Sequence, residues 1–481
     1  MIENFDKLWG LTKPAFKQDR SWHRARNLAL SSLVCLGRRT ITGMLTTSGL
    51  QFKDWSSEYK LFEQERIDIG KIFKPITETV VKQYPTTKDI SIVLDDTIIR
   101  KSGTKIYGTK WLRDPLGPKF QTNIVWGQRF LQTSIILPDS FDNLCSARAL
   151  PIDFKHCPMS PKPKNKNVSS AEISEWKNRR RKERISVIGA EKISEIRSQI
   201  NLIENGSNKK IIVSVDGGYT NSTVFKGIPL NTALIGRIRK DAKIFDLPCK
   251  PDSTTRGRQR IYGQQLPTPE QIRQDESIPW ISTQAFAAGK LHDFKVKTIN
   301  NIRWRGAGAN NLRLVVIAPL RYRLSKSKRL YYNKSVYLIC SDTELDIQTL
   351  LQNYIRRWEI EDSFRNEKTS LGIGQTQTWS PNSAALAPAF FVASYSYLLL
   401  ATHFTYPKID NTPVLPLPIW RRQKPPRRIT INRMISLLRA DVWQKGLGIY
   451  NKTDFDSITT LTAKSVLLDN SLRSAVLYAT N

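Results

Sequence analysis

The sequence predicts an α/β protein in which a mixed β-sheet is flanked by helices, and three observations support this fold class. Residues 1 to about 85 carry apolar side chains at three- and four-residue steps, the period of an amphipathic helix. From Asp89 onward, short apolar and β-branched runs typical of buried strands appear. Helical periodicity returns at about residue 346. We therefore expect helices before, between and after the strands of one core.

Length and charge restrict the class of protein. At 481 residues the chain is longer than one hydrophobic core usually serves, so several modules are expected. Its 75 Lys and Arg residues against 42 Asp and Glu residues leave a net charge of +33. Because this excess is spread along the chain, it favours a long polyanion such as a nucleic acid over ribosomal or anionic membrane binding.

Cysteine usage and the chain start indicate a reduced, cytoplasmic protein. The five cysteines are an odd number without C-x-x-C spacing, so neither a disulfide framework nor a zinc site is predicted. The first residues lack the basic-then-apolar pattern of a signal peptide. Residues 385–404 have no charged side chain over the length of a membrane span, but we favour a buried core helix and expect no membrane partner.

The N-terminal helical stretch contains a short basic segment at residues 37–42, at the start of an expected helix. Its Arg38 and Arg39 are candidate DNA-binding residues, because cations and hydroxyls at a helix start suit phosphates. An exposed charged turn is the alternative. Pro85 closes this segment.

Two apolar strands that end in aspartates are the next elements. Ile90–Leu94 is expected to end at Asp95 and Asp96, and residues 210–215 form a second strand followed by Asp216. Further segments are expected between and after them: strands at 122–126 and 131–137, a Pro- and Lys-rich loop at 151–168, a helix at 171–201, and a third strand at 233–239.

The rest of the chain divides into a β-rich part and a helical part. Residues 241–345 are expected to be β-rich, with strands at 312–319 and 336–340 paired around a turn at 325–328. A strong helix is predicted over 346–370, and a small helical tail over 432–443.

The helix over 346–370 carries the most specific motif. Tyr354, Arg357, Glu361 and Lys368 are separated by two, three and six residues. At about 100° per residue these four side chains share one helix face. This spacing is the signature of the insertion-sequence-four family of DDE transposases, and the chain resembles that family. Asp96 followed by Thr97, and Asp216 after its strand, match the first two catalytic positions of the family.

The resemblance implies a ribonuclease-H-like core with a mixed five-stranded sheet, interrupted by a β-rich insertion. It implies the following organisation: 1–85, an N-terminal helical DNA-binding domain; 86–240, the first part of the core; 241–345, the insertion; 346–405, the second part of the core; 406–481, a C-terminal basic and helical region. Catalytic and metal-binding roles fall on Asp96, Asp216 and Glu361. Tyr354, Arg357 and Lys368 would contact phosphates beside the cleavage point.

The same resemblance implies cut-and-paste DNA transposition in a prokaryotic cell. Two Mg²⁺ ions, for which Mn²⁺ is expected to substitute, would assist phosphodiester hydrolysis and strand transfer. Carboxylates suit these hard cations better than His or Cys does. The expected partners are double-stranded DNA, as terminal inverted repeats and target, and a second copy of the chain in a homodimer.

Several positions keep alternatives. Asp95 rivals Asp96, because neighbouring strand residues point to opposite faces and only one can face the metal ions. Tyr354 could be a core aromatic, and Arg357 could simply pair with Glu361. Arg237, Arg239 and Lys240 could grip the transposon end or could protect an exposed strand edge. Trp304 or Trp280 could stack on a flipped base or could be buried in the core. Gly217 and Gly218 could let the backbone come close to DNA or could simply form a turn.

Two other functional classes remain open from the sequence. A transposase-derived DNA-binding protein without catalysis would keep the scaffold but need no intact acids. A ribonuclease-H-fold repair or junction nuclease would lack the Tyr–Arg–Glu–Lys spacing and the large insertion.

Overall fold

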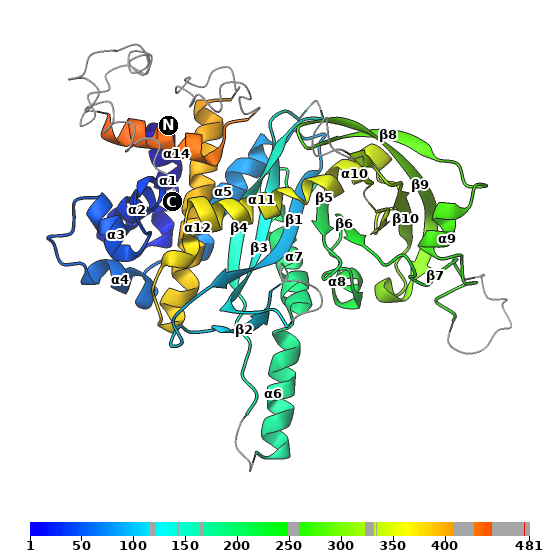
Figure 1. The fold of residues 1–481 in the computed structure, drawn as a ribbon, viewed down its shortest axis with the longest axis horizontal. Coiled ribbons are helices and arrows are strands. Elements are labelled where there is room, and N and C mark those ends of the chain that lie inside the picture. Colours follow the sequence, from blue (N-terminus) through cyan, green and yellow to red (C-terminus); the bar gives the residue numbers. More distant parts are fainter. Residues whose placement is uncertain are drawn as a thin grey trace.

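Helices form the N-terminal part of the protein, as predicted (Figure 1). The computed structural model describes residues 1–114, 122–141, 144–163, 168–248, 259–322, 331–332, 334–407, 428–444 and 476. The N-terminal helices are α1 (Ile2–Gly10), η1 (Lys13–Ala15), α2 (Asp19–Val34), α3 (Ile41–Thr47), α4 (Ser56–Glu63) and α5 (Ile69–Gln83). Four of them, α1, α2, α4 and α5, contact the long C-terminal helix α12 (Pro381–Thr405).

Five neighbouring strands form the expected ribonuclease-H-like core. In spatial order they are β4 (Ala147–His156), β3 (Ile124–Pro138), β1 (Ile90–Arg100), β5 (Ile211–Val215) and β6 (Thr232–Arg237). β3 runs antiparallel to both β4 and β1, whereas β1, β5 and β6 are parallel. β2 (Lys110–Arg113) pairs with β3 as well. This order places the carboxyl end of β5 beside the middle of β1.

The expected β-rich stretch continues the same sheet. Its strands are β7 (Ile244–Phe245), β8 (Ile281–Ala287), β9 (Lys290–Trp304), β10 (Leu312–Ile317) and β13 (Val336–Cys340). β13 pairs with β6, so eleven of the described strands form one sheet that extends beyond the five core strands. β10 and β13 pair antiparallel as predicted, while the turn at 325–328 lies outside the described residues. Small elements accompany them: α9 (Pro269–Gln274), η2 (Arg305–Ala307), and the pair β11 (Arg321–Tyr322) and β12 (Tyr331–Tyr332).

Several predicted boundaries are wrong. β1 continues past both aspartates to Arg100, because that half still pairs with β3 after leaving β5. The two strands expected at 122–137 are one, β3. Pro151 lies within β4 instead of a loop, and a register shift in the β3–β4 pairing near this position accommodates it.

The two long predicted helices are interrupted. Residues 170–201 form α6 (Ser170–Lys182) and α7 (Ile185–Asn201), because Arg184 is extended. The helix expected over 346–370 divides into α10 (Ile347–Arg356), α11 (Glu359–Arg365) and a π-helical turn, η3 (Asn366–Ser370). α8 (Ser222–Lys226), η4 (Ile373–Gln375) and α14 (Ile431–Trp443) complete the described elements.

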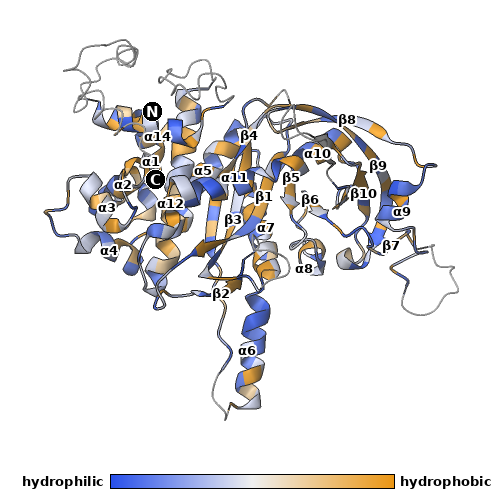
Figure 2. Cartoon of the chain, in the orientation of Figure 1, coloured by the Kyte–Doolittle hydropathy of each residue, from blue (hydrophilic) through white to orange (hydrophobic). Residues whose placement is uncertain are grey.

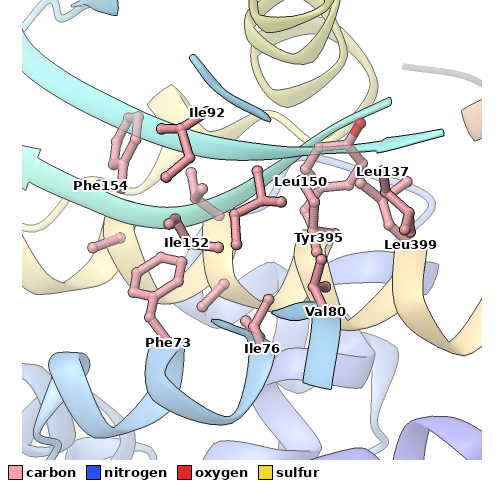
Figure 3. Packing of buried hydrophobic residues seen from close by; sticks show 14 of the residues in the cluster. Phe73, Ile76, Val80, Ile92, Leu137, Leu150, Ile152, Phe154, Tyr395 and Leu399 are labelled. Atoms are coloured by element: carbon pink, nitrogen blue, oxygen red, sulfur yellow. The ribbon is translucent and has the colours of Figure 1, made fainter. Parts of the chain in front are cut away.

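The core lies between α5, α12 and one face of the sheet (Figure 3). Phe73 and Ile76 of α5 pack near Ile152 and Phe154 of β4, with Tyr395 of α12 beside them. α12 is long and apolar enough to cross a membrane, but 89% of its most apolar window is buried inside the protein. It is therefore a core helix, as the sequence analysis favoured.

Candidate active site

The two adjacent aspartates of β1 have different partners because they point to opposite faces of the sheet. The Tyr219 hydroxyl donates a hydrogen bond to Asp96 Oδ1 at 2.9 Å, and Asp96 Oδ2 lies 3.0 Å from Arg129 Nε on β3. Asp95 Oδ2 lies 3.7 Å from Nη1 of Arg357. Asp95 therefore lies on the face toward the Arg357 segment, and Asp96 on the face toward Tyr219.

Asp216 directly follows β5, and its carboxylate closes the turn there. Its Oδ1 accepts hydrogen bonds from the backbone N–H groups of Gly218 at 2.8 Å and Tyr219 at 3.3 Å. β1 and β5 pair in parallel from Ile90 to Leu94 on β1, so Asp216, which follows β5, lies beside the two aspartates of β1. Gly217 and Gly218 form part of this turn, which agrees with the simpler of the two interpretations of these glycines.

Glu361 reaches the aspartates through Arg357, which lies at the junction between α10 and α11. Arg357 Nη1 is 3.3 Å from Glu361 Oε1 and 3.7 Å from Asp95 Oδ2. The guanidinium also lies 5.8 Å from the centre of the Tyr354 ring. The arginine thus joins the helix carrying Glu361 to the centre of the sheet, and it forms the salt bridge that was its structural alternative.

The acidic groups lie close enough to affect each other's ionisation. Burial, followed by repulsion from Asp216 and Asp96, raises the pKa of Asp95 to about 7. The pKa values of Asp96 and Glu361 are also raised, mainly by burial, with Asp216 adding repulsion in both cases. Only partial compensation comes from Arg129 and Arg357. The negative charges of these four carboxylates are therefore only partly neutralised, and a further positive charge near them would be favourable.

The donor set fits divalent cations in chemistry. Asp96, Asp216 and Glu361 offer only oxygen ligands, which Mg²⁺ and Mn²⁺ prefer. A bound cation would also relieve the repulsion between the carboxylates. In the arrangement described, Arg129 and Arg357 occupy the carboxylates, and the described residues contain no group of three His, Cys, Asp or Glu side chains close enough to hold a metal ion. Metal binding would therefore need Asp96 and Glu361 to exchange their arginine partners for the ion.

Lys368 is separated from the other signature residues by a change of helix type. Its ammonium lies 5.8 Å from the Phe364 ring centre within the π-helical turn, and burial lowers its pKa. Tyr354, Arg357 and Glu361 share contacts, while the described contacts do not connect Lys368 with Glu361. The contacts agree with a shared face for the first three residues, whereas for Lys368, two turns beyond Glu361, the shared face stays a prediction.

The buried neighbour of Lys368, Glu367, gives a stability prediction. Its side chain is fully buried, accepts a hydrogen bond from Ser363 Oγ at 2.7 Å, and burial raises its pKa to about 7 from 4.5. Because the folded-state pKa is the higher one, this stabilisation is complete below about pH 4.5 and is lost as the pH rises to about 7. Glu367→Gln should therefore match the parent at low pH and exceed its unfolding free energy by up to about 3 kcal/mol at pH 8.

Unfolding by denaturant across this pH range tests the Glu367 prediction. Glu276→Gln, at an exposed position, is the matched control and should leave the pH profile unchanged. An offset between Glu367→Gln and the parent that is the same at every pH would contradict the prediction.

Basic residues at the end of β6 and just after it line a cavity of about 1040 Å³ beside Gly217. Its walls include Arg237, Arg239, Lys240 and Trp304. Arg239 is 84% exposed and pairs with Asp241 at 2.9 Å. Trp304 is partly buried with its ring edge against Phe225. The structure brings these four DNA-binding candidates together next to the Asp216 turn.

Trp280 has a different environment from Trp304. The Lys297 ammonium lies 4.6 Å from its ring centre, and the ring packs against the main core. These contacts agree with the buried-tryptophan alternative.

Arg38 and Arg39 behave differently from each other. Arg38 is exposed, whereas the Arg39 side chain is 2% exposed, and its guanidinium donates to the carbonyl oxygens of Ser32 and Cys35. Arg39 cannot contact DNA in this position, so its predicted DNA-binding role is wrong. Its guanidinium instead satisfies carbonyls at the end of α2, a need that the sequence does not reveal.

Tyr219 and Arg129 are site residues that sequence reasoning missed. Both contact Asp96, and Tyr219 is also packed against Gly189 of α7, where an added Cβ would lie 2.9 Å from the ring. Tyr219 follows Asp216 closely, which is a usable signal, but Arg129 lies in an ordinary strand and gives none.

A ribonuclease-H-like sheet with carboxylates gathered at the carboxyl end of its parallel strands defines a nuclease-type catalytic core. Comparison with known protein families identifies which nucleases. Residues 13–310 match the DDE superfamily endonucleases, and since this is more than half of the chain, the protein belongs to that superfamily. The matched range contains Asp96 and Asp216 and ends before Glu361. No curated protein sequence matched the chain.

Proposed function

We propose that the protein is a DNA transposase of the insertion-sequence-four family that moves its element by a cut-and-paste route. The observation that supports this proposal is that Asp96 and Glu361, from distant parts of the chain, each lie close enough to Asp216 for its charge to raise their pKa values, with Arg357 paired to Glu361. The Tyr–Arg–Glu–Lys spacing supports the family, and the charge of +33 supports a DNA partner.

Under this proposal Asp96, Asp216 and Glu361 would hold two Mg²⁺ ions, or Mn²⁺ in their place. Bound metal would stabilise the attacking and leaving oxygens of the phosphodiester during hydrolysis and strand transfer. Arg357 and Tyr354 would then be free to contact the phosphate beside the cut, with Lys368 further along the same segment. Arg237, Arg239, Lys240 and Trp304 would hold the adjacent DNA end in their cavity.

Duplex DNA carrying the terminal inverted repeats of the element is the substrate for the test. We expect Mg²⁺-dependent cleavage at the ends, transfer of a pre-cut end into a plasmid, and a dimer that bridges two ends. In the cell, the same reaction would take place in the bacterial cytoplasm. Cleavage without strand transfer would favour a repair or junction nuclease instead.

One observation favours a catalytically silent DNA-binding protein. Arg129 and Arg357 pair with the carboxylates, and the described part of the chain shows no ready three-ligand cluster. End binding with no cleavage at any Mg²⁺ or Mn²⁺ concentration would support this alternative.

Tyr219→Phe is expected to slow cleavage by about tenfold and to raise the Mg²⁺ concentration needed for half-maximal rate. The substitution removes the hydroxyl that orients Asp96, and loss of such outer contacts typically weakens metal sites by about 10- to 100-fold. Tyr397→Phe is the control, because it also deletes a buried hydroxyl, bonded to the Ile72 carbonyl at 2.9 Å, far from the acids. Equal losses in the two variants would contradict a role in positioning Asp96.

A further inference from the structure

Helix α6 stands out from the body of the protein. None of its residues is buried, and it extends below the sheet on the side where β2 and α8 also lie (Figure 1). Figure 2 shows it as mainly hydrophilic. A helix that is polar on nearly all sides and buries no residue does not stabilise the core, so a binding role is the more informative interpretation.

The projecting helix is bonded to the chain that leads into it. The Trp176 indole N–H donates to the Ser160 carbonyl at 3.3 Å, and the Glu183 carboxylate accepts the Ser160 backbone N–H at 2.9 Å. A capping box between Ser169 and Glu172 stabilises the outer end. These contacts use the Trp176–Glu183 face, so α6 is held against the chain that leads into it.

Charge is distributed unevenly along α6. The carboxylates Glu172 and Glu175 lie toward the outer end, whereas Arg179, Arg181 and Lys182 are exposed at the end nearest the body. Cations near a helix C-terminus are favoured by the helix dipole, but that effect needs only one or two of them. A basic cluster that faces solvent fits a polyanion, while the lack of an apolar face does not fit a protein interface.

The basic end of α6 lies close to the candidate active site. Arg184 precedes α7, and Gly189, five positions later, touches the ring of Tyr219, whose hydroxyl donates to Asp96. At about 1.5 Å per residue, the start of α7 is about 8 Å along the helix from this contact. Since a DNA strand carries one phosphate for about every 3.4 Å of helix axis, a duplex bound at Asp96 would bring backbone phosphates past this end of α6.

We propose that the base of α6, with Lys177, Arg179, Arg181 and Lys182, binds the DNA sugar-phosphate backbone a few nucleotides from the cut. This inference rests on the proposed function and adds a named contact surface to it. The cluster reads no base, since flexible cations on phosphates position a duplex without specifying sequence.

The test is a quadruple variant, Lys177→Gln, Arg179→Gln, Arg181→Gln and Lys182→Gln, in the full-length protein. Glutamine preserves helix propensity and these positions are exposed, so the fold should persist. Binding to a labelled duplex with the element's ends is measured between about 50 and 200 mM salt. We expect about tenfold weaker binding and a salt slope reduced by about 2 to 4, one unit for each lost phosphate contact.

The control keeps the charge: Arg179→Lys with Arg181→Lys should retain the parental salt slope. Parental DNA binding with an unchanged slope in the quadruple variant would overturn the inference while leaving the proposed function intact. Loss of self-association with an unchanged slope would also overturn it, and would assign the surface to a second copy. If the parent itself does not bind DNA, both proposals fail.

Discussion

Glu361→Gln is expected to abolish DNA cleavage while end binding stays within about twofold of the parent. The amide has nearly the shape of the carboxylate but is a poor ligand for Mg²⁺, so the ions that stabilise the reacting oxygens would be lost. Removing electrostatic stabilisation of this kind lowers rates by at least about 10²- to 10³-fold. Single-turnover cleavage and equilibrium binding on the same duplex measure the two effects separately.

A neighbouring carboxylate provides the control for Glu361. Glu359→Gln removes the 3.0 Å ion pair with Arg428, which holds the segment before α14 to α11, and it touches none of the acids at the sheet edge. This variant should lose stability and keep cleavage. Retained cleavage in Glu361→Gln would refute the catalytic assignment, and weakened binding would show that the side chain supports structure instead.

Those parts of the fold that depend on local pattern could be predicted from the sequence. The first half of β1, Ile90–Leu94, and β5 are buried on both faces, so each is a mainly apolar run, and the aspartates that follow mark where the parallel pairing of these strands ends. The one-turn spacing of Arg357 and Glu361 gave their contact directly, because neighbours four residues apart meet on a helix. Local periodicity therefore located the centre of the candidate site.

What the sequence could not show depends on tertiary pairing. β8 and β9 carry polar residues on their exposed faces, and Pro151 argued for a loop, yet pairing with neighbours makes strands of both segments. The burial of Arg39 and the Tyr219–Asp96 hydrogen bond likewise join residues from separate elements. Nothing in a local window indicates such partners.

The division of the signature helix has a physical consequence for the site. Because α10 ends at Arg356 and α11 starts at Glu359, Arg357 lies at the junction, where its guanidinium contacts both Asp95 and Glu361. Lys368 follows in the π-helical turn, with its ammonium over the Phe364 ring. Such turns are frequent at functional sites, since they aim a side chain that a regular helix would place elsewhere.

Asp96→Asn is expected to eliminate cleavage, whereas Asp95→Asn should lower it by about tenfold. Asp96 is the proposed first metal ligand, and Tyr219 and Arg129 hold its carboxylate in position near Asp216. Asp95 instead orients Arg357, and outer groups of this kind contribute about 10- to 100-fold. The prediction separates a residue that binds metal from one that positions a neighbour.

Metal titration gives the comparison its second measurement. Asp95→Asn should keep the Mg²⁺ concentration for half-maximal cleavage near the parental value, because it leaves all three proposed ligands in place. Any residual activity of Asp96→Asn should need much higher Mg²⁺ or Mn²⁺, since one of those ligands is missing. The reverse pattern would assign Asp95 as the first ligand, and the metal ions would then lie on the sheet face that Asp95 already shares with Arg357 and Glu361.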